Sequence, residues 1–271
     1  MLDKADINEY KQRVIADFNS RTNYDKGNNF HPLFANRLIE LAKLQSGQKI
    51  LDIATGTGGV AIAAAQIVGS EGKVVGVDIS TGMLSQAQRK IEAAGLKNVE
   101  LQEADADYIT FNDNSFDAIL CASAIVYLTD IPAALRNWHR FLKSGGLVAF
   151  SCFAETAHTM SVIYRAVAQR YDISLPNPNE PLGTPKKCYR MLQEAGFKDI
   201  KVIEEQFGNY ISDPERLWNI NLNSACGNPL LQLSAEKLEQ CKAEYLAEVQ
   251  ALATKQGIWN DVTTFFVLGR K

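Results

Sequence analysis

Runs of basic residues, long apolar segments and an apolar leader are all missing from this sequence. Its 271 residues carry 28 Lys and Arg against 31 Asp and Glu, for a net charge of −3. The basic residues are scattered, whereas nucleic-acid-binding proteins usually carry a basic stripe. Met1 to Phe18 is charged throughout, and no apolar segment reaches the roughly eighteen residues of a membrane helix. We therefore expect a cytoplasmic protein without stable membrane insertion, whose main partner is not nucleic acid.

The cysteines are few, and their spacing matches neither a disulfide framework nor a metal site. The five cysteines are odd in number, and none pair at a distance typical of metal ligands. We therefore expect no disulfides and no metal site. Cys121 and Cys152 fall in two segments predicted to be neighbouring strands, where buried thiols pack as small hydrophobic groups.

What the sequence does contain is a segment, Lys49 to Ala65, with the pattern of a ligand-binding turn. Its first residues form an apolar run that suits a buried parallel strand. Gly56, Gly58 and Gly59 then permit a tight turn and a close approach of a ligand to the main chain. A helix is predicted from Val60 to Val68. Strand, glycine turn and helix N-terminus together predict a nucleotide-type site.

Two ligand classes fit such a turn. Gly56, Gly58 and Ala61 satisfy the dinucleotide fingerprint, and Asp78 follows at about the distance of a ribose-binding acid. Asp52, however, lies in the strand just before the turn, where a carboxylate would repel a pyrophosphate and attract a cationic amino group. The residues alone leave both classes open.

Several further segments carry a family resemblance. In order and spacing they resemble the motifs of class I S-adenosylmethionine (SAM) dependent methyltransferases, in the branch that contains the ubiquinone/menaquinone C-methyltransferases. The matching segments are Leu51 to Gly58, Val75 to Ser80, Glu103 to Ala106, Ser115 to Ile119 and Leu142 to Gly146. Ala54 departs from the pattern, because many members carry another glycine there.

The resemblance and the alternation of predicted strands and helices imply the same fold class. We expect an α/β fold with a doubly wound, seven-stranded, mostly parallel Rossmann-like sheet, and the resemblance implies that its last strand is antiparallel. Residues 1–45 would form a helical lid, 46–212 with 257–271 the SAM-binding core, and 213–256 a helical insertion over the substrate site. Predicted strands are 49–53, 73–78, 99–103, 116–122, 146–153, 199–205 and 264–270. Predicted helices are 5–20, 32–44, 60–68, 81–94, 131–142, 157–171, 186–195, 215–223 and 235–255.

The resemblance also assigns cofactor contacts. It implies that Asp52 and the main chain of the glycine turn hold the amino acid head of SAM, that Asp78 accepts from both ribose hydroxyls, and that Asp105 accepts from the adenine amino group. The other expected cofactor-binding residues are Tyr24, Ala54, Thr55, Gly56, Gly58, Ile79, Met83, Ala106 and Ala122. For each acid the alternative is a helix cap or turn residue without contact to a ligand.

Catalytic residues are harder to name. Methyl transfer is an in-line displacement that depends mainly on alignment and on exclusion of water. Relatives often carry histidines after the fourth strand, but this sequence has Val126 and Tyr127 there. The candidates for a base are Tyr127 and His31, which lies at a loop-to-helix junction in the predicted lid.

We therefore expect an enzyme that transfers a methyl group from SAM to an oxygen, nitrogen or carbon atom of a small, partly apolar molecule, as a monomer or homodimer. One alternative is a quinone-ring or carrier-bound acyl methyltransferase. An NAD-type dehydrogenase and a SAM-binding module without catalysis are alternatives from other classes.

Overall fold

The computed structural model describes residues 9–22, 24–25, 30–224 and 228–271, and the chain forms two compact units. The first unit consists of Met1–Cys152, Thr184–Ile203 and Phe265–Lys271. The second unit consists of Phe153–Gly183 and Glu204–Thr264. The predicted boundaries 1–45, 46–212 with 257–271, and 213–256 stay predictions, because these units are defined by contacts and not by function.

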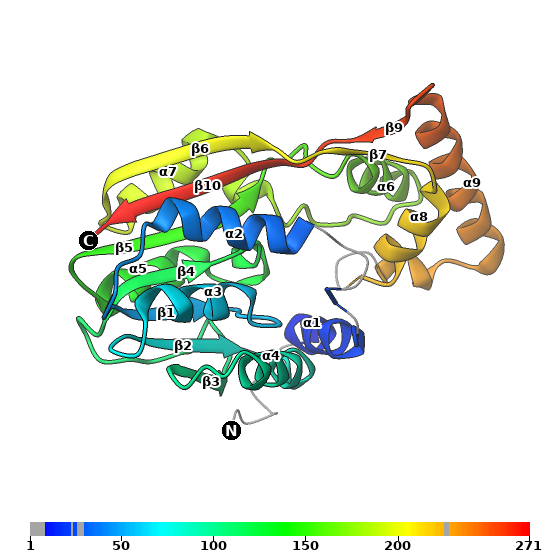
Figure 1. Ribbon diagram of the computed structural model, residues 1–271. Coiled ribbons are helices and arrows are strands. Elements are labelled where there is room, and N and C mark those ends of the chain that lie inside the picture. Colours follow the sequence, from blue (N-terminus) through cyan, green and yellow to red (C-terminus); the bar gives the residue numbers. More distant parts are fainter. Residues whose placement is uncertain (1–8, 23, 26–29, 225–227) are drawn as a thin grey trace. The chain divides into compact units, whose positions relative to one another are not determined.

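The first unit is built on a seven-stranded sheet with the order β3-β2-β1-β4-β5-β10-β6 (Figure 1). β1 pairs in parallel with β2 and β4, β2 with β3, and β4 with β5. The expected mostly parallel sheet with an antiparallel last strand is confirmed. The strands are β1 (Lys49–Ile53), β2 (Lys73–Asp78), β3 (Val99–Glu103), β4 (Phe116–Cys121), β5 (Leu142–Phe153), β6 (Lys198–Gln206) and β10 (Thr263–Arg270).

Helices pack against the sheet. Ile50, Leu51 and Ile53 of β1 are fully buried, as expected for a strand packed on both faces. Figure 1 shows α2 lying across the near face, where it packs against α3. The helices of this unit are α1 (Glu9–Ser20), α2 (Phe30–Ala42), α3 (Gly59–Val68), α4 (Thr81–Ala93), α5 (Ile131–Phe141) and α7 (Pro185–Glu194), with a short helix η1 (Ile125–Tyr127). Residues 5–8 of the predicted first helix lie outside the described residues.

Local capping explains where several of these helices begin. The side chain of Ser80 accepts from the backbone N–H of Met83, and that of Thr184 accepts from Lys187. Such caps satisfy N–H groups that have no partner within the helix. β2 therefore ends at Asp78 and the chain turns directly into α4, which places Asp78 at the carboxyl edge of the sheet.

The second unit is held by a separate aromatic cluster. The ring centroids of Tyr164 and Trp218 lie 5.0 Å apart, and those of Trp218 and Tyr245 lie 5.2 Å apart. All three rings are almost completely buried. The elements of this unit are α6 (Thr159–Arg170), η2 (Glu180–Leu182), β7 (Asn209–Ile211), α8 (Pro214–Leu222), η3 (Asn228–Gln232), α9 (Ala235–Ala251), β8 (Ala253–Thr254) and β9 (Gly257–Asn260).

The prediction of a helix up to Lys255 is wrong at its end. α9 stops at Ala251, and the following residues form β8 and β9, which join β7 in the antiparallel sheet β7-β9-β8. The hydroxyl of Thr254 donates to the carbonyl of Gly257 at 2.8 Å, and Gly257 has a φ of 109°, which favours glycine. This turn reverses the chain. The three short strands had no alternating apolar pattern long enough to predict them.

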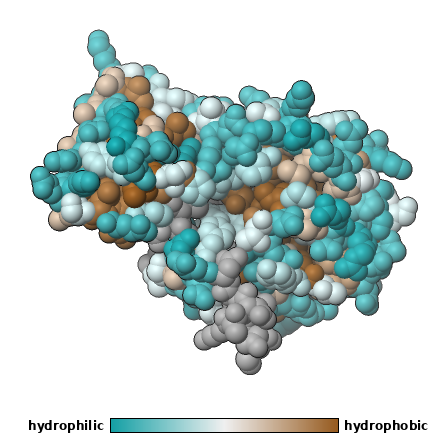
Figure 2. Space-filling view, turned by 180° about the vertical axis from the view of Figure 1, so that it is seen from behind, coloured by the Kyte–Doolittle hydropathy of each residue, from teal (hydrophilic) through white to brown (hydrophobic). Residues whose placement is uncertain are grey.

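Figure 2 shows hydrophilic side chains over most of the visible face, with separate smaller apolar patches. Among the described residues, no helix combines the length and apolar character needed to cross a bilayer.

Ala54 adopts a left-handed backbone conformation, with a φ of 50°. This conformation costs an L-residue about 1–2 kcal/mol, whereas glycine adopts it freely. We expect A54G to raise the free energy of unfolding by about 1 kcal/mol, measured by urea denaturation. A104G is the matched control, because Ala104 lacks a positive φ and the added backbone freedom should destabilise by about 0.5–1 kcal/mol. A destabilised A54G would contradict this account.

Candidate active site

Three buried carboxylates lie at the carboxyl ends of three adjacent strands. Asp52 is in β1, Asp78 ends β2, and Asp105 follows β3. They are 1%, 8% and 2% exposed. The N–H of Ala104 donates to the carbonyl of Asp78 at 3.0 Å, which holds the ends of β2 and β3 together. The structure therefore places the three acids at one edge of the sheet, as the sequence predicted.

Asp78 connects this edge to the glycine turn. Its Oδ2 accepts from the N–H of Gly56 at 2.8 Å, and its Oδ1 accepts from the N–H of Ser80 at 2.9 Å. Burial raises the pKa of Asp78, while these backbone hydrogen bonds oppose that shift. The carboxylate keeps further acceptor capacity, because each oxygen has more than one lone pair.

Asp52 is held mainly by the protein itself. Its Oδ2 accepts from the hydroxyl of Thr55 at 2.5 Å, and its carboxylate also accepts from the backbone of Ala61 in the first turn of α3. Burial raises the pKa of Asp52 to about 7. The hydrogen bond from Thr55 lowers this pKa, and the nearby Asp78 raises it further. A carboxylate at a helix N-terminus is also favoured by the helix dipole. The helix-capping alternative therefore describes part of what Asp52 does.

The glycines of the turn have different roles. Gly56 has a φ of 57°, and among the described residues a Cβ added there would meet nothing closer than the Ala54 carbonyl at 4.0 Å. Gly58 has a φ of 83°, and its Cβ would lie 3.2 Å from that of Ala87 in α4. Gly56 thus faces open space that a ligand can enter, whereas Gly58 permits the close packing of the turn against α4.

The carboxylate of Asp105 has one satisfied and one unsatisfied oxygen. Oδ1 accepts from Lys11 Nζ at 2.8 Å and from the N–H of Asp107 at 3.0 Å. Oδ2 is buried and has no hydrogen-bond partner among the described residues. A buried oxygen without a partner is costly, so it marks a place where a ligand donor would be stabilised.

Lys11 was missed at the sequence level. It belongs to α1 and also forms an ion pair with Asp107 at 2.6 Å. A single lysine in a charged helix carries no sequence signal that separates it from a solvated one, because its burial comes from tertiary contacts such as those to Asp105 and Asp107.

Aromatic side chains from the N-terminal segment lie beside this edge. The ring of Phe18 meets that of Tyr127 edge-on at 5.4 Å and that of Tyr24 at 6.2 Å. Burial raises the pKa of the Tyr24 hydroxyl, with smaller contributions from Tyr127 and Asp78. Tyr24 and Tyr127 therefore lie close to one another and to the carboxylate edge.

Polar contacts fasten the same segment to the sheet unit. Asn19 Oδ1 accepts from the Ser80 hydroxyl at 2.7 Å and from the N–H of Gly82 at 2.9 Å. Asp25 accepts from the hydroxyl of Thr57 at 2.9 Å and forms an ion pair with Lys90. These contacts hold α1 and Asp25 next to the glycine turn and the start of α4.

The remaining predicted residues are placed as follows. Ile79, Ala106 and Ala122 are half-buried and follow β2, β3 and β4 at the same edge. Met83 is buried in the first turn of α4. His31 lies in α2, but its side chain is outside the described part of the chain.

Comparison with known proteins identifies the family. A model of the ubiE/COQ5 methyltransferase family matches residues 5–209. The chain belongs to the ubiE/COQ5 methyltransferase family. It is therefore a SAM-dependent methyltransferase, and SAM is its methyl donor. This assignment decides against the dinucleotide interpretation of the glycine turn.

Individual relatives agree with the family assignment. The chain is 31% identical over 193 residues to a demethylmenaquinone methyltransferase of Staphylococcus epidermidis, which covers 69% of this chain and 78% of that protein. It is 34% identical over 144 residues to the aklanonic acid methyltransferase DauC of a Streptomyces species, covering 52% and 66%. A structure of Haemonchus contortus phosphoethanolamine N-methyltransferase 2 with S-adenosyl-L-methionine matches with a TM-score of 0.61 and 20% identity, over 98% of this chain and 60% of that one, and shows a shared fold.

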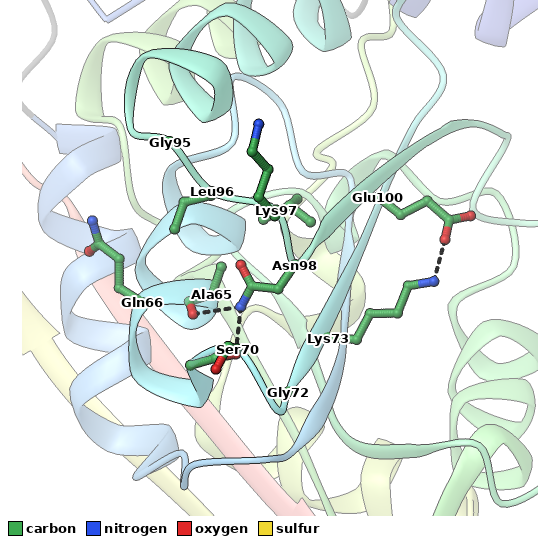
Figure 3. Close-up of a pocket in the computed structure, with 12 residues that line it drawn as sticks. Ala65, Gln66, Ser70, Gly72, Lys73, Gly95, Leu96, Lys97, Asn98 and Glu100 are labelled. Carbon is green, nitrogen blue, oxygen red and sulfur yellow. Dashed lines mark hydrogen bonds and ion pairs between the residues drawn. The ribbon is translucent and has the colours of Figure 1, made fainter.

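A hollow of about 690 Å³ lies at the opposite edge of the methyltransferase sheet, at the start of β2 and β3 (Figure 3). Asn98 Nδ2 donates to the carbonyls of Ala65 and Gly69 at 2.9 and 2.8 Å, and Lys73 pairs with Glu100 at 2.6 Å. Asn98 thus caps the last turn of α3. Because the side chains of Asn98, Lys73 and Glu100 bind protein groups, we assign this hollow a structural role.

Replacing Asp78 should weaken cofactor binding. We expect D78A to raise the dissociation constant of SAM by an amount that corresponds to about 1.5–3 kcal/mol, because hydrogen bonds to a charged group are lost. Calorimetric titration measures this directly. D113A is a matched control, since Asp113 is 58% exposed at the side chain and pairs with Arg140. An unchanged dissociation constant for D78A would show that Asp78 does not contact SAM.

Cofactor binding should also release a proton from Asp52. In the free protein its pKa is about 7, so the carboxyl is largely protonated at about pH 6, and a nearby ligand ammonium would lower that pKa. We expect S-adenosylhomocysteine to bind with release of up to about one proton near pH 6 and with almost none at about pH 8.5. Affinity should accordingly rise with pH and level off above 7.

Calorimetry in buffers of different ionisation enthalpy measures this proton release, and D52N is the control that should abolish it. Equal proton release at both pH values would show that Asp52 does not face the ligand's charge.

Proposed function

We propose that SAM binds along the carboxylate edge of the first unit. Three observations support this placement. Asp105 Oδ2 can accept from the adenine amino group, and the Asp78 carboxylate can accept from the ribose hydroxyls. The open space beside Gly56 can take the amino acid head. Asp52 would stabilise the ammonium of that head. The residues present therefore fit the cofactor.

For the acceptor we propose a small, partly apolar ring compound of the quinone type in its reduced form. The observation that carries this proposal is the aromatic group formed by Phe18, Tyr24 and Tyr127 beside the carboxylate edge, because flat rings pack well against aromatic side chains. The demethylmenaquinone methyltransferase named above, which acts on a quinone, adds support.

The chain's own contribution would be alignment and exclusion of water. SAM supplies an electrophilic methyl group when bound. Phe18 and Tyr24 would orient the acceptor ring and keep water from it, since an in-line displacement requires a fixed approach. The Tyr127 hydroxyl would accept a hydrogen bond from a ring hydroxyl, whose electron density moves through the ring to the carbon that attacks the methyl group. The S–CH3 bond would break, S-adenosylhomocysteine would leave, and the methylated ring carbon would then lose its proton to solvent.

The histidines offer no clearer base. Burial and the neighbouring Arg165 lower the pKa of His158 to about 4, and His158 lies in the second unit. His139 packs edge-on against Phe197, with ring centroids 5.0 Å apart. Tyr127 and His31 remain the proposed candidates.

A second candidate is methyl transfer to a carboxylic acid. The match to DauC favours it, because that protein acts on an acid and its identity to this chain is 34%. The two candidates differ in the bond formed: a ring methyl is joined through carbon and survives mild alkali, whereas a methyl ester is hydrolysed.

Incubation with deuterium-labelled SAM distinguishes these candidates. The acceptors are a short-chain demethylated naphthoquinol, kept reduced, and an aromatic polycyclic acid of similar size. We expect mass spectrometry to show one labelled methyl group on the quinol that alkali does not remove. An alkali-labile product formed only from the acid would favour the second candidate. Binding of SAM without methylation of either compound would refute the proposed acceptor class.

A further inference from the structure

Lys11 is a buried cation contributed by α1 to the proposed adenine end of the site. It is 5% exposed, although α1 also carries exposed charges such as Glu9. Its Nζ lies 2.8 Å from Asp105 Oδ1 and 2.6 Å from Asp107 Oδ2. Lysine is rarely buried to this degree unless it is paired, so these two carboxylates define its position.

These contacts fix the orientation of the Asp105 carboxylate. Lys11 and the N–H of Asp107 both donate to Oδ1, so turning the carboxylate would break two hydrogen bonds in a buried setting. Oδ2 is left as an acceptor without a partner in the described structure. Because an ionised carboxylate oxygen only accepts, this position favours a ligand atom that donates.

Asp107 is held in turn by the loop after β4. It accepts from the N–H and from the hydroxyl of Thr129, at 3.0 and 2.8 Å. Burial alone would raise the pKa of Asp107, but hydrogen bonds from Lys11 and Thr129 lower it overall. Lys11 therefore joins α1 to the loops that follow both β3 and β4.

We propose that Lys11 is a positioning residue that makes the site select an aminopurine over an oxopurine nucleoside. This inference rests on the proposed placement of SAM. The amino group of adenine can donate to Asp105 Oδ2, whereas the carbonyl oxygen of hypoxanthine at the same place would face another acceptor. The selectivity depends on a carboxylate that cannot turn, and Lys11 restrains it together with the backbone N–H of Asp107.

The test compares S-adenosylhomocysteine with S-inosylhomocysteine, which differ at that one position of the base. Calorimetry measures the dissociation constants of both for the full chain and three variants. D107N is the matched control, because the amide oxygen that it introduces can still accept from Lys11. K11M/D107N removes Lys11 together with one of its two partner carboxylates. The amide introduced at position 107 can then donate a hydrogen bond to Asp105 and turn its carboxylate. K11R keeps the cation.

We expect the unmodified protein to prefer S-adenosylhomocysteine by about a hundredfold or more, because a site built to receive a donor rejects an analogue that lacks it. D107N and K11R should keep this ratio within about threefold, and K11M/D107N should reduce it to about tenfold or less. Thermal unfolding without ligand shows that each variant is folded. Loss of stability alone would not change the ratio of the two dissociation constants, because both are measured on the same protein.

An unchanged ratio in K11M/D107N would overturn the role of Lys11 while leaving the proposed cofactor site intact. Equal binding of the two nucleosides by the unmodified protein, or no binding of either, would overturn both the role of Lys11 and the placement of the adenine at Asp105.

Discussion

The hydrogen bonds that backbone N–H groups donate to the Asp78 carboxylate determine much of the geometry at the sheet edge. Gly56 and Ser80 belong to the loops after β1 and β2, and both donate to Asp78. The glycine turn and the start of α4 are therefore fixed relative to one buried charge. Such a charge is tolerated only where it is well hydrogen-bonded, so the edge is ordered by the same groups that suit it to a polar ligand.

Most of the sheet unit follows from local sequence. β1 was predictable because an apolar run precedes glycines that cannot continue a strand. Asp78 and Asp105 were predictable because the segments around them resemble the family's motifs in the right order. Ala54 shows why the family favours glycine at that position, since its φ is positive. The placement of Asp52, Asp78 and Asp105 at one edge is a consequence of parallel pairing, which local patterns indicate well.

The rest depends on contacts between distant segments. Lys11 is separated from Asp105 by 94 residues, and nothing in the sequence around it indicates burial. The end of α9 was overestimated because its apolar stripe continues to Leu252, whereas the residues after it form β8 and β9, and β9 pairs with the distant strand β7. Asp52 was expected to face a ligand, but the hydroxyl of Thr55 and the N-terminus of α3 also bind it. Tertiary structure thus determines which polar groups stabilise the fold and which remain available to a ligand.

The central claim is that the buried carboxylates of the first unit hold the nucleoside of the methyl donor. A crystal structure of the protein with S-adenosylhomocysteine tests it most directly. The account predicts ribose hydroxyls within hydrogen-bonding distance of Asp78 and the adenine amino group beside Asp105 Oδ2, with Lys11 still bound to Oδ1. A nucleoside bound elsewhere, for example in the hollow beside Asn98 and Lys73, would contradict it.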